Sequence, residues 1–361
     1  MSGERESLEL GSSVRTHNYR SVGECEHPVW VISSESGEEV AVRCGSRLAN
    51  RCESCSRLAV RDYQRLIGDG FTDVDSGEFR FFFLTLTAPS FGPTHSVPKP
   101  GRDLQRCRCG AFHDPVEDAD LRGVCIDPNS YDFEGCCRWN YGLGDLWDST
   151  RSRLCQRFPG LSYAKVSEYQ ARGALHVHVL VRIPLGVPLI YGELTGAEAL
   201  LEVARSSATR SGLRWGEQGD CKRIVQAEDR DRFVYYMAKV LAYVTKDVMD
   251  DCVVVSAQAK VHYRLLDLAA SRMRCDRCRD WNEPCGGLSH RRWGARSSVL
   301  SKSRESKSHL PWSRVRRLDL KARRREFARM AEALRVGVAE LARSAAGVKP
   351  LELMELNVIR V

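Results

Sequence analysis

Two histidines and one glutamate are spaced so that neighbouring strands could bring them together. His176 and His178 lie one residue apart in an apolar, β-branched run, so both side chains project from one face of an extended strand, opposite the valine face. If the chain reverses about Arg172, Glu168 falls opposite His176 and shares its face. Two imidazoles and a carboxylate suit a divalent metal that also binds a substrate oxygen. Alone, the His-x-His pattern also fits two exposed histidines on a sheet.

A second candidate set has tyrosines and lysines at a repeated spacing. Tyr236 and Tyr243 are each followed three residues later by a lysine, Lys239 and Lys246. Apolar residues recur every three or four positions across residues 229–247, which predicts a helix, and seven residues are about two turns, so the tyrosines face the same way. A nearby ammonium favours the phenolate and can hold a phosphate. An amphipathic helix with core aromatics and exposed lysines has the same pattern.

Cysteines cluster with the spacing of zinc ligands. The chain has 15 cysteines and no expected export signal, which argues against disulfides and favours a cytoplasmic protein. The first group reads C-x18-C-x7-C-x2-C, and four thiolates can hold one tetrahedral zinc ion. Buried thiols that act as small hydrophobes are the alternative. The three groups are Cys25, Cys44, Cys52 and Cys55; Cys275, Cys278, Cys285 and His290; and a looser set of Cys107, Cys109, His113 and Cys125.

The net charge of +8 is concentrated near the C-terminus, where residues 291–326 hold thirteen Lys or Arg against three Asp or Glu. This density fits either a solvated helix face or a surface that neutralises phosphates. The most apolar later stretch is broken by Pro184, Pro188 and Gly192, so we expect no membrane span and no membrane partner.

The patterning predicts an α+β fold in which a central antiparallel sheet carries the metal site and helices flank it. Strands are predicted over residues 79–88, 161–170 and 173–183, and helices over 56–68, 142–158, 229–247 and 318–345. A zinc ribbon would precede the sheet, and a basic helical region would follow it. The expected boundaries are a disordered terminus at 1–24, the ribbon at 25–70, the catalytic domain at 71–260, a Cys/His and basic region at 261–310 and a C-terminal helix at 311–361.

In order along the chain, these motifs resemble those of HUH rolling-circle replication initiators. The matching blocks are F-L-T-L-T-A-P-S-F-G at Phe83–Gly92, E-x7-H-V-H at Glu168–His178 and Y-M-A-K at Tyr236–Lys239. The chain is most similar to the replication initiators of actinobacterial plasmids and integrative elements. That resemblance covers residues 25–310 and is carried by Arg43–Leu58, Leu84–His95, Ser162–His178 and Leu300–Arg304.

The resemblance implies a DNA strand-nicking and joining enzyme. Mg²⁺ or Mn²⁺, held by His176, His178 and Glu168, would polarise the scissile phosphate. Structural Zn²⁺ at the first two cysteine groups is expected from their spacing and not from the resemblance. A tyrosine would attack the phosphorus to form a 5′-phosphotyrosine, and the freed 3′-hydroxyl would prime leading-strand synthesis. The implied partners are origin DNA, single-stranded or locally melted, and a host helicase and polymerase.

One departure bears on the nucleophile. The family usually places its two tyrosines four residues apart, whereas here Val240 stands at that position and Tyr243 follows three residues later. We favour Tyr236, with Tyr243 as the second candidate. Other readings are a relaxase or single-strand transposase with the same chemistry, a non-catalytic, zinc-stabilised DNA-binding regulator, and a metallohydrolase that forms no covalent DNA adduct.

Overall fold

The computed structural model describes residues 24–32, 39–47, 49, 51–72, 78–243, 256–273, 292–295, 300–306 and 310–324. The chain divides into two compact units: residues 1–44 with 315–361, and residues 45–314. In the first unit, β1 (Val29–Ile32) pairs antiparallel with β2 (Glu39–Val42). Of the predicted helix at 318–345, the described part, up to residue 324, is helical. No described helix is both long and apolar enough to cross a bilayer.

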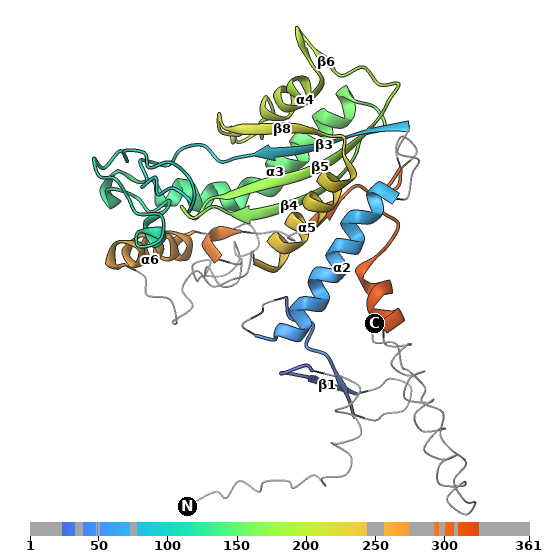
Figure 1. Cartoon of the computed structure of the whole chain (residues 1–361), viewed down its shortest axis with the longest axis horizontal. Coiled ribbons are helices and arrows are strands. Elements are labelled where there is room, and N and C mark those ends of the chain that lie inside the picture. Colours follow the sequence, from blue (N-terminus) through green and yellow to red (C-terminus); the bar gives the residue numbers. More distant parts are fainter. Residues whose placement is uncertain are drawn as a thin grey trace, which may run out of the picture. The chain divides into compact units, whose positions relative to one another are not determined.

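The second unit is built on a five-stranded antiparallel sheet, which confirms the predicted α+β class (Figure 1). The strands lie in the order β8-β3-β5-β4-β9, so β5, the longest, is at the centre. Every described pairing within this sheet is antiparallel. The strands are β3 (Phe79–Leu86), β4 (Ser162–Tyr169), β5 (Leu175–Pro184), β8 (Gly219–Ile224) and β9 (Leu300–Lys302).

The β4–β5 hairpin has the predicted register. Glu168 lies directly opposite His176, and Val166 lies opposite His178. Gly173 adopts a φ of +84° in the turn, a left-handed conformation that favours glycine. A Cβ at this position would also lie 2.4 Å from a Leu266 methyl carbon, so both the turn and its packing require glycine.

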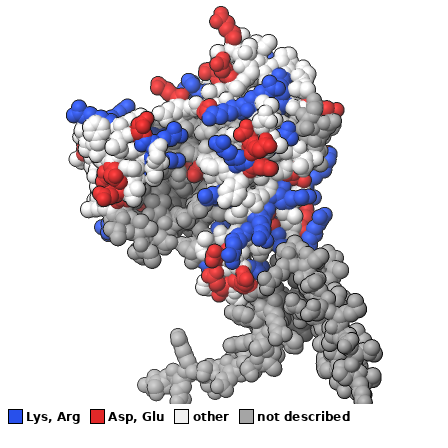
Figure 2. Space-filling view, viewed as in Figure 1, with Lys and Arg blue, Asp and Glu red and all other residues white. Residues whose placement is uncertain are grey.

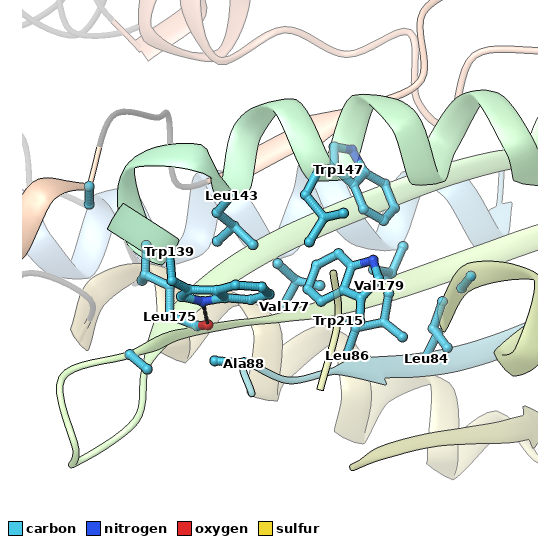
Figure 3. Close-up of a cluster of buried hydrophobic side chains, with 14 of the residues drawn as sticks. Leu84, Leu86, Ala88, Trp139, Leu143, Trp147, Leu175, Val177, Val179 and Trp215 are labelled. Atoms are coloured by element: carbon cyan, nitrogen blue, oxygen red, sulfur yellow. Dashed lines mark hydrogen bonds between the residues drawn. The ribbon is translucent and has the colours of Figure 1, made fainter. Parts of the chain in front are cut away.

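One face of the sheet packs against α3 (Phe133–Arg157), as Figure 3 shows. Trp139 Nε1 donates to the Leu175 carbonyl over 2.8 Å, which satisfies a buried polar group within this core. The helix begins nine residues before the predicted start at 142, because the Asp132 side chain accepts from Gly135 N and caps it. The buried apolar side chains at this face include Leu84, Leu86, Trp139, Leu143, Trp147, Val177, Val179 and Trp215.

On the histidine face, α5 (Ala227–Tyr243) packs against α2 (Glu53–Thr72) and contacts β4. This face is therefore more buried than expected: Leu180 and Arg182, which alternate with the valines, are fully enclosed. Both helices extend beyond their predicted bounds at the N-terminal end. The other elements are β6 (Ile190–Tyr191), β7 (Leu194–Thr195), α4 (Gly196–Arg205), α6 (Ala257–Arg272) and the 3-10 helices η3 (Ala119–Leu121), η4 (Pro128–Ser130) and η6 (Arg292–Gly294).

Candidate metal and nucleophile site

Three potential metal-ligand atoms converge at the β4–β5 hairpin. Glu168 Oε2 lies 3.1 Å from His176 Nε2 and 3.2 Å from His178 Nε2, and the two Nε2 atoms are 2.8 Å apart. The register causes this convergence: Glu168 and His176 are directly opposed, and His178 follows two residues later on the same face. All three groups are at most partly exposed. Two imidazoles and a carboxylate are a donor set suited to a divalent cation.

The protonation pattern around His178 fits a metal ligand. Thr85 lies opposite His178 across the β3–β5 ladder, and its Oγ1 is 3.0 Å from His178 Nδ1. When Nδ1–H donates to the threonine hydroxyl, Nε2 keeps its lone pair for a cation. His176 Nδ1, in contrast, is buried and has no hydrogen-bond partner within the described part of the chain.

The electrostatic environment favours an anionic glutamate and a neutral histidine. Burial acts to raise the pKa of Glu168, but the contacts of its carboxylate with His176 and His178 outweigh burial and hold the pKa well below its usual range. Burial lowers the pKa of His178, against the opposing effect of Glu168. A carboxylate beside an unprotonated imidazole is the form that binds a cation.

Tyr236 brings its hydroxyl to the same point from α5. The hydroxyl donates to Glu168 Oε2 over 3.0 Å and lies 3.1 Å from His178 Nε2. Phe83 packs between the strand and the helix: its ring stacks on His178 of β5, with the ring centroids 5.4 Å apart, and on Phe233 of α5, with the centroids 4.2 Å apart. Burial, followed by the negative charge of Glu168, raises the pKa of Tyr236, so the phenol is neutral at neutral pH.

The other residues of the predicted tyrosine–lysine set are placed differently. Tyr235 is 56% exposed and, as the residue before Tyr236, projects about 100° around the helix axis from it. Lys239 lies exposed on α5, three residues after Tyr236. Tyr243 is the last residue of α5, and its side chain, like Lys246, lies outside the described residues. The roles of Lys239, Tyr243 and Lys246 stay predictions.

The structure places the three predicted zinc-ligand groups differently. In the first unit, the Cys44 N–H points at Cys25 Sγ over 3.4 Å, and in the second, Cys52 and Cys55 lie buried at the start of α2; that all four bind one zinc ion stays a prediction. The group Cys275, Cys278, Cys285 and His290 lies outside the described residues. The third set was predicted with one wrong member, because His95 joins Cys107, Cys109 and His113 in place of Cys125.

Cys125 is excluded from that set by its position in the core. It is completely buried, and its backbone N–H donates to His262 Nδ1. Burial raises the pKa of its thiol to about 11, which disfavours the thiolate that zinc binds. Thr94 instead pairs with Cys125 in an isolated bridge, and the next residue, His95, reaches the cluster.

Basic side chains lie near the site on the edge strand. Lys222 and Arg223 of β8 are exposed and lie opposite Phe83 and Phe82 of β3. Figure 2 shows Lys and Arg side chains over β8 and along α2, with Asp and Glu side chains between them. This face is mixed in charge rather than uniformly basic.

The fold and the site define an α+β protein whose antiparallel sheet carries two histidines and a glutamate beside a helix-borne tyrosine. The chain belongs to the replication initiator family, since the family model described as "Replication initiator protein, pSAM2" matches residues 14–351. A replication initiator protein of Streptomyces ambofaciens is 31% identical over 246 residues, or 58% of this chain and 52% of that protein. The chain thus spans about half the length of this curated relative. No solved structure matches it.

Proposed function

We propose that this chain initiates plasmid replication by nicking and rejoining one DNA strand at the origin, with Tyr236 as the nucleophile. Glu168, His176 and His178 would hold Mg²⁺ or Mn²⁺. One observation carries the proposal: the Tyr236 hydroxyl lies 3.0 Å from Glu168 Oε2 and 3.1 Å from His178 Nε2. A nucleophile and a candidate cation site therefore share one position, as metal-assisted phosphoryl transfer requires.

In the proposed reaction, Tyr236 Oη forms a bond to the scissile phosphorus and the bond from phosphorus to the 3′-oxygen breaks. The phenolic proton leaves to solvent, with which the 37% exposed Tyr236 is in contact, and the departing 3′-oxygen takes up a proton. When bound, the ion supplies positive charge that polarises the scissile phosphate. The hydrogen bond to Glu168 orients the phenol, and Phe83 fixes the ring of His178.

The 5′-phosphotyrosine keeps the energy of the broken phosphodiester bond. Attack on it by a 3′-hydroxyl is the reverse of the nicking step, so the strand can be rejoined without ATP. The 3′-hydroxyl freed by nicking would prime synthesis by a host polymerase, with a host helicase opening the duplex. A tyrosine at a partly buried site needs single-stranded or locally melted DNA.

The cysteine groups and the basic C-terminal region would serve DNA binding. Zn²⁺ bound by Cys25, Cys44, Cys52 and Cys55 would fold the ribbon, because four thiolates complete a closed tetrahedral site. A second zinc ion at Cys275, Cys278, Cys285 and His290 is proposed from the spacing alone. The lysines and arginines of residues 291–326 would bind backbone phosphates.

A nicking assay with labelled single-stranded origin DNA tests this function. Wild-type protein should cleave the strand in Mg²⁺ or Mn²⁺ and not in EDTA, and Tyr236→Phe should abolish cleavage. Tyr235→Phe is the matched control and should retain cleavage, because Tyr235 projects from a different side of α5 than Tyr236. Loss of cleavage in Tyr243→Phe but not in Tyr236→Phe would transfer the role to Tyr243. Binding without cleavage under any metal would favour the regulator instead.

A further inference from the structure

A second cluster of metal-ligand atoms lies outside the candidate active site, in the segment that follows β3. It consists of His95, Cys107, Cys109 and His113, whose ligand atoms all lie within 4.8 Å of one another. His95 Nδ1 is 3.1 Å from His113 Nε2, Cys109 Sγ is 3.3 Å from His113 Nε2, and Cys107 Sγ is 3.8 Å from His95 Nδ1.

These separations match the edges of a zinc tetrahedron. With Zn–N of about 2.0–2.1 Å and Zn–S of about 2.3 Å, tetrahedral angles give an N–N edge of about 3.3 Å and an S–N edge of about 3.6 Å. The measured N–N distance of 3.1 Å and S–N distances of 3.3 and 3.8 Å lie close to these values. Three of the six edges of the tetrahedron thus have about the lengths that a single ion needs, and all four ligand atoms lie within 4.8 Å of one another.

The backbone presents the two cysteines from a tight turn. Cys107 N donates to Ala111 O over 2.8 Å, and Gly110 N donates to Cys107 O over 2.9 Å. Gly110 has a φ of +94°, which lets the chain reverse directly after Cys109. The backbone N–H of Ser96 points at Cys107 Sγ over 3.4 Å, and such a contact stabilises a thiolate.

Each histidine has a side-chain partner at the ring nitrogen that faces away from the cluster. His113 Nδ1 lies 3.2 Å from Asp118 Oδ2, which leaves Nε2 for the ion. The Gln258 side-chain amide lies 2.9 Å from His95 Nε2 and fixes that ring with Nδ1 turned inward. The same amide nitrogen donates to the Cys125 carbonyl over 3.1 Å, so Gln258 ties the His95 ring to the core residue next to the cluster.

We propose that His95, Cys107, Cys109 and His113 bind one structural zinc ion. Four protein ligands leave no open position, and His95, Cys107 and His113 are buried, so the ion stabilises structure rather than binding substrate. The site ties residues 94–96, residues 106–113 and the first turn of α6 together. The two ends of the segment between β3 and α3 also contact the β4–β5 turn. Tyr131 donates to the Arg172 carbonyl, and Arg172 donates to the carbonyls of Ala88 and Pro89.

The test compares the zinc content of variants of the full chain, so that zinc bound at other cysteine groups contributes equally to each. Metal per protein is measured by mass spectrometry after purification without chelator. The double variant Cys107→Ala/Cys109→Ala should contain one zinc equivalent less than wild type. Cys125→Ala is the matched control and should lose none, because Cys125 lies outside the cluster. Equal zinc in the double variant and wild type would overturn the proposal, as would a loss in Cys125→Ala alone.

A second variant covers the case in which the double variant fails to fold. His113→Cys replaces one ligand by another, so the site should keep its metal. In Co²⁺-substituted protein, the thiolate-to-cobalt charge-transfer absorbance should then rise by the contribution of one additional thiolate. An unchanged charge-transfer band would mean that position 113 is not a ligand and would overturn the proposal. Neither measurement depends on nicking, so the site and the proposed function can fail separately.

Discussion

The contact between Thr85 of β3 and His178 of β5 predicts that removing the threonine hydroxyl weakens metal binding at His178. Thr85→Val keeps the shape of the side chain but removes the Oγ1 that lies 3.0 Å from His178 Nδ1. Without that acceptor, the tautomer with a proton on Nδ1 loses its stabilisation, and Nε2 is less available to a cation.

The size of the effect follows from this one hydrogen bond. A hydrogen bond between neutral groups is worth about 1 kcal/mol, which alone is about a fivefold change in affinity, since about 1.4 kcal/mol corresponds to a factor of ten. Loss of such a partner behind a metal-bound histidine typically weakens binding about 10- to 100-fold. We therefore expect the Kd for Mn²⁺ to rise about tenfold in Thr85→Val, at the lower end of that range.

Calorimetric titration with Mn²⁺, together with nicking rates over a range of metal concentrations, measures the effect. The half-saturating metal concentration should rise about tenfold, whereas the nicking rate at saturating metal should match wild type. Thr87→Val is the matched control, because Thr87 is buried on the same segment but donates to the Gln218 carbonyl instead. Unchanged metal affinity in Thr85→Val, or an equal change in Thr87→Val, would refute the reasoning.

Two further predictions concern stability. Burial lowers the pKa of His262 to about 4, below the unfolded value of about 6.5, so the unfolded state alone binds a proton between these values and stability falls as the pH falls through this window. Between pH 7 and pH 4.5, the free energy of unfolding should fall by about 2 to 3 kcal/mol less in His262→Gln than in wild type, as measured by urea unfolding. An equal fall in the two proteins would contradict this. Arg182 is fully buried and donates to the carbonyls of Gly70 and Pro311, so Arg182→Met should cost about 3 kcal/mol. The exposed Arg138→Met should cost less than about 0.5 kcal/mol, and equal costs would show that the buried bonds contribute nothing.

The sequence predicts the fold best where apolar and polar residues alternate strictly along a strand. In β5, valines alternate with histidines, and a short turn ending in Gly173 fixes the partner strand, so the pairing of Glu168 with His176 is predicted and confirmed. Strand β8 was not predicted. It holds Asp220, Lys222 and Arg223 and shows no apolar alternation, which an edge strand tolerates because one side faces water.

The site is predictable where its residues are local and not where the tertiary fold supplies them. Glu168, His176 and His178 fall within eleven residues of sequence, and the period of a strand brings them together. Thr85 reaches His178 only through the pairing of β3 with β5, across 93 residues of sequence. His95 was missed for the same reason, since its approach to the cysteines depends on the bridge between Thr94 and Cys125.

The central claim is that Tyr236 becomes covalently joined to DNA, and one measurement addresses it directly. Wild-type protein is incubated with single-stranded origin DNA and Mn²⁺, denatured, digested with nuclease and trypsin, and analysed by tandem mass spectrometry. The account predicts a nucleotide adduct on the peptide from Phe233 to Lys239, with fragment ions that assign it to Tyr236 rather than Tyr235. An adduct on any other residue, or cleaved DNA with no adduct, would contradict it.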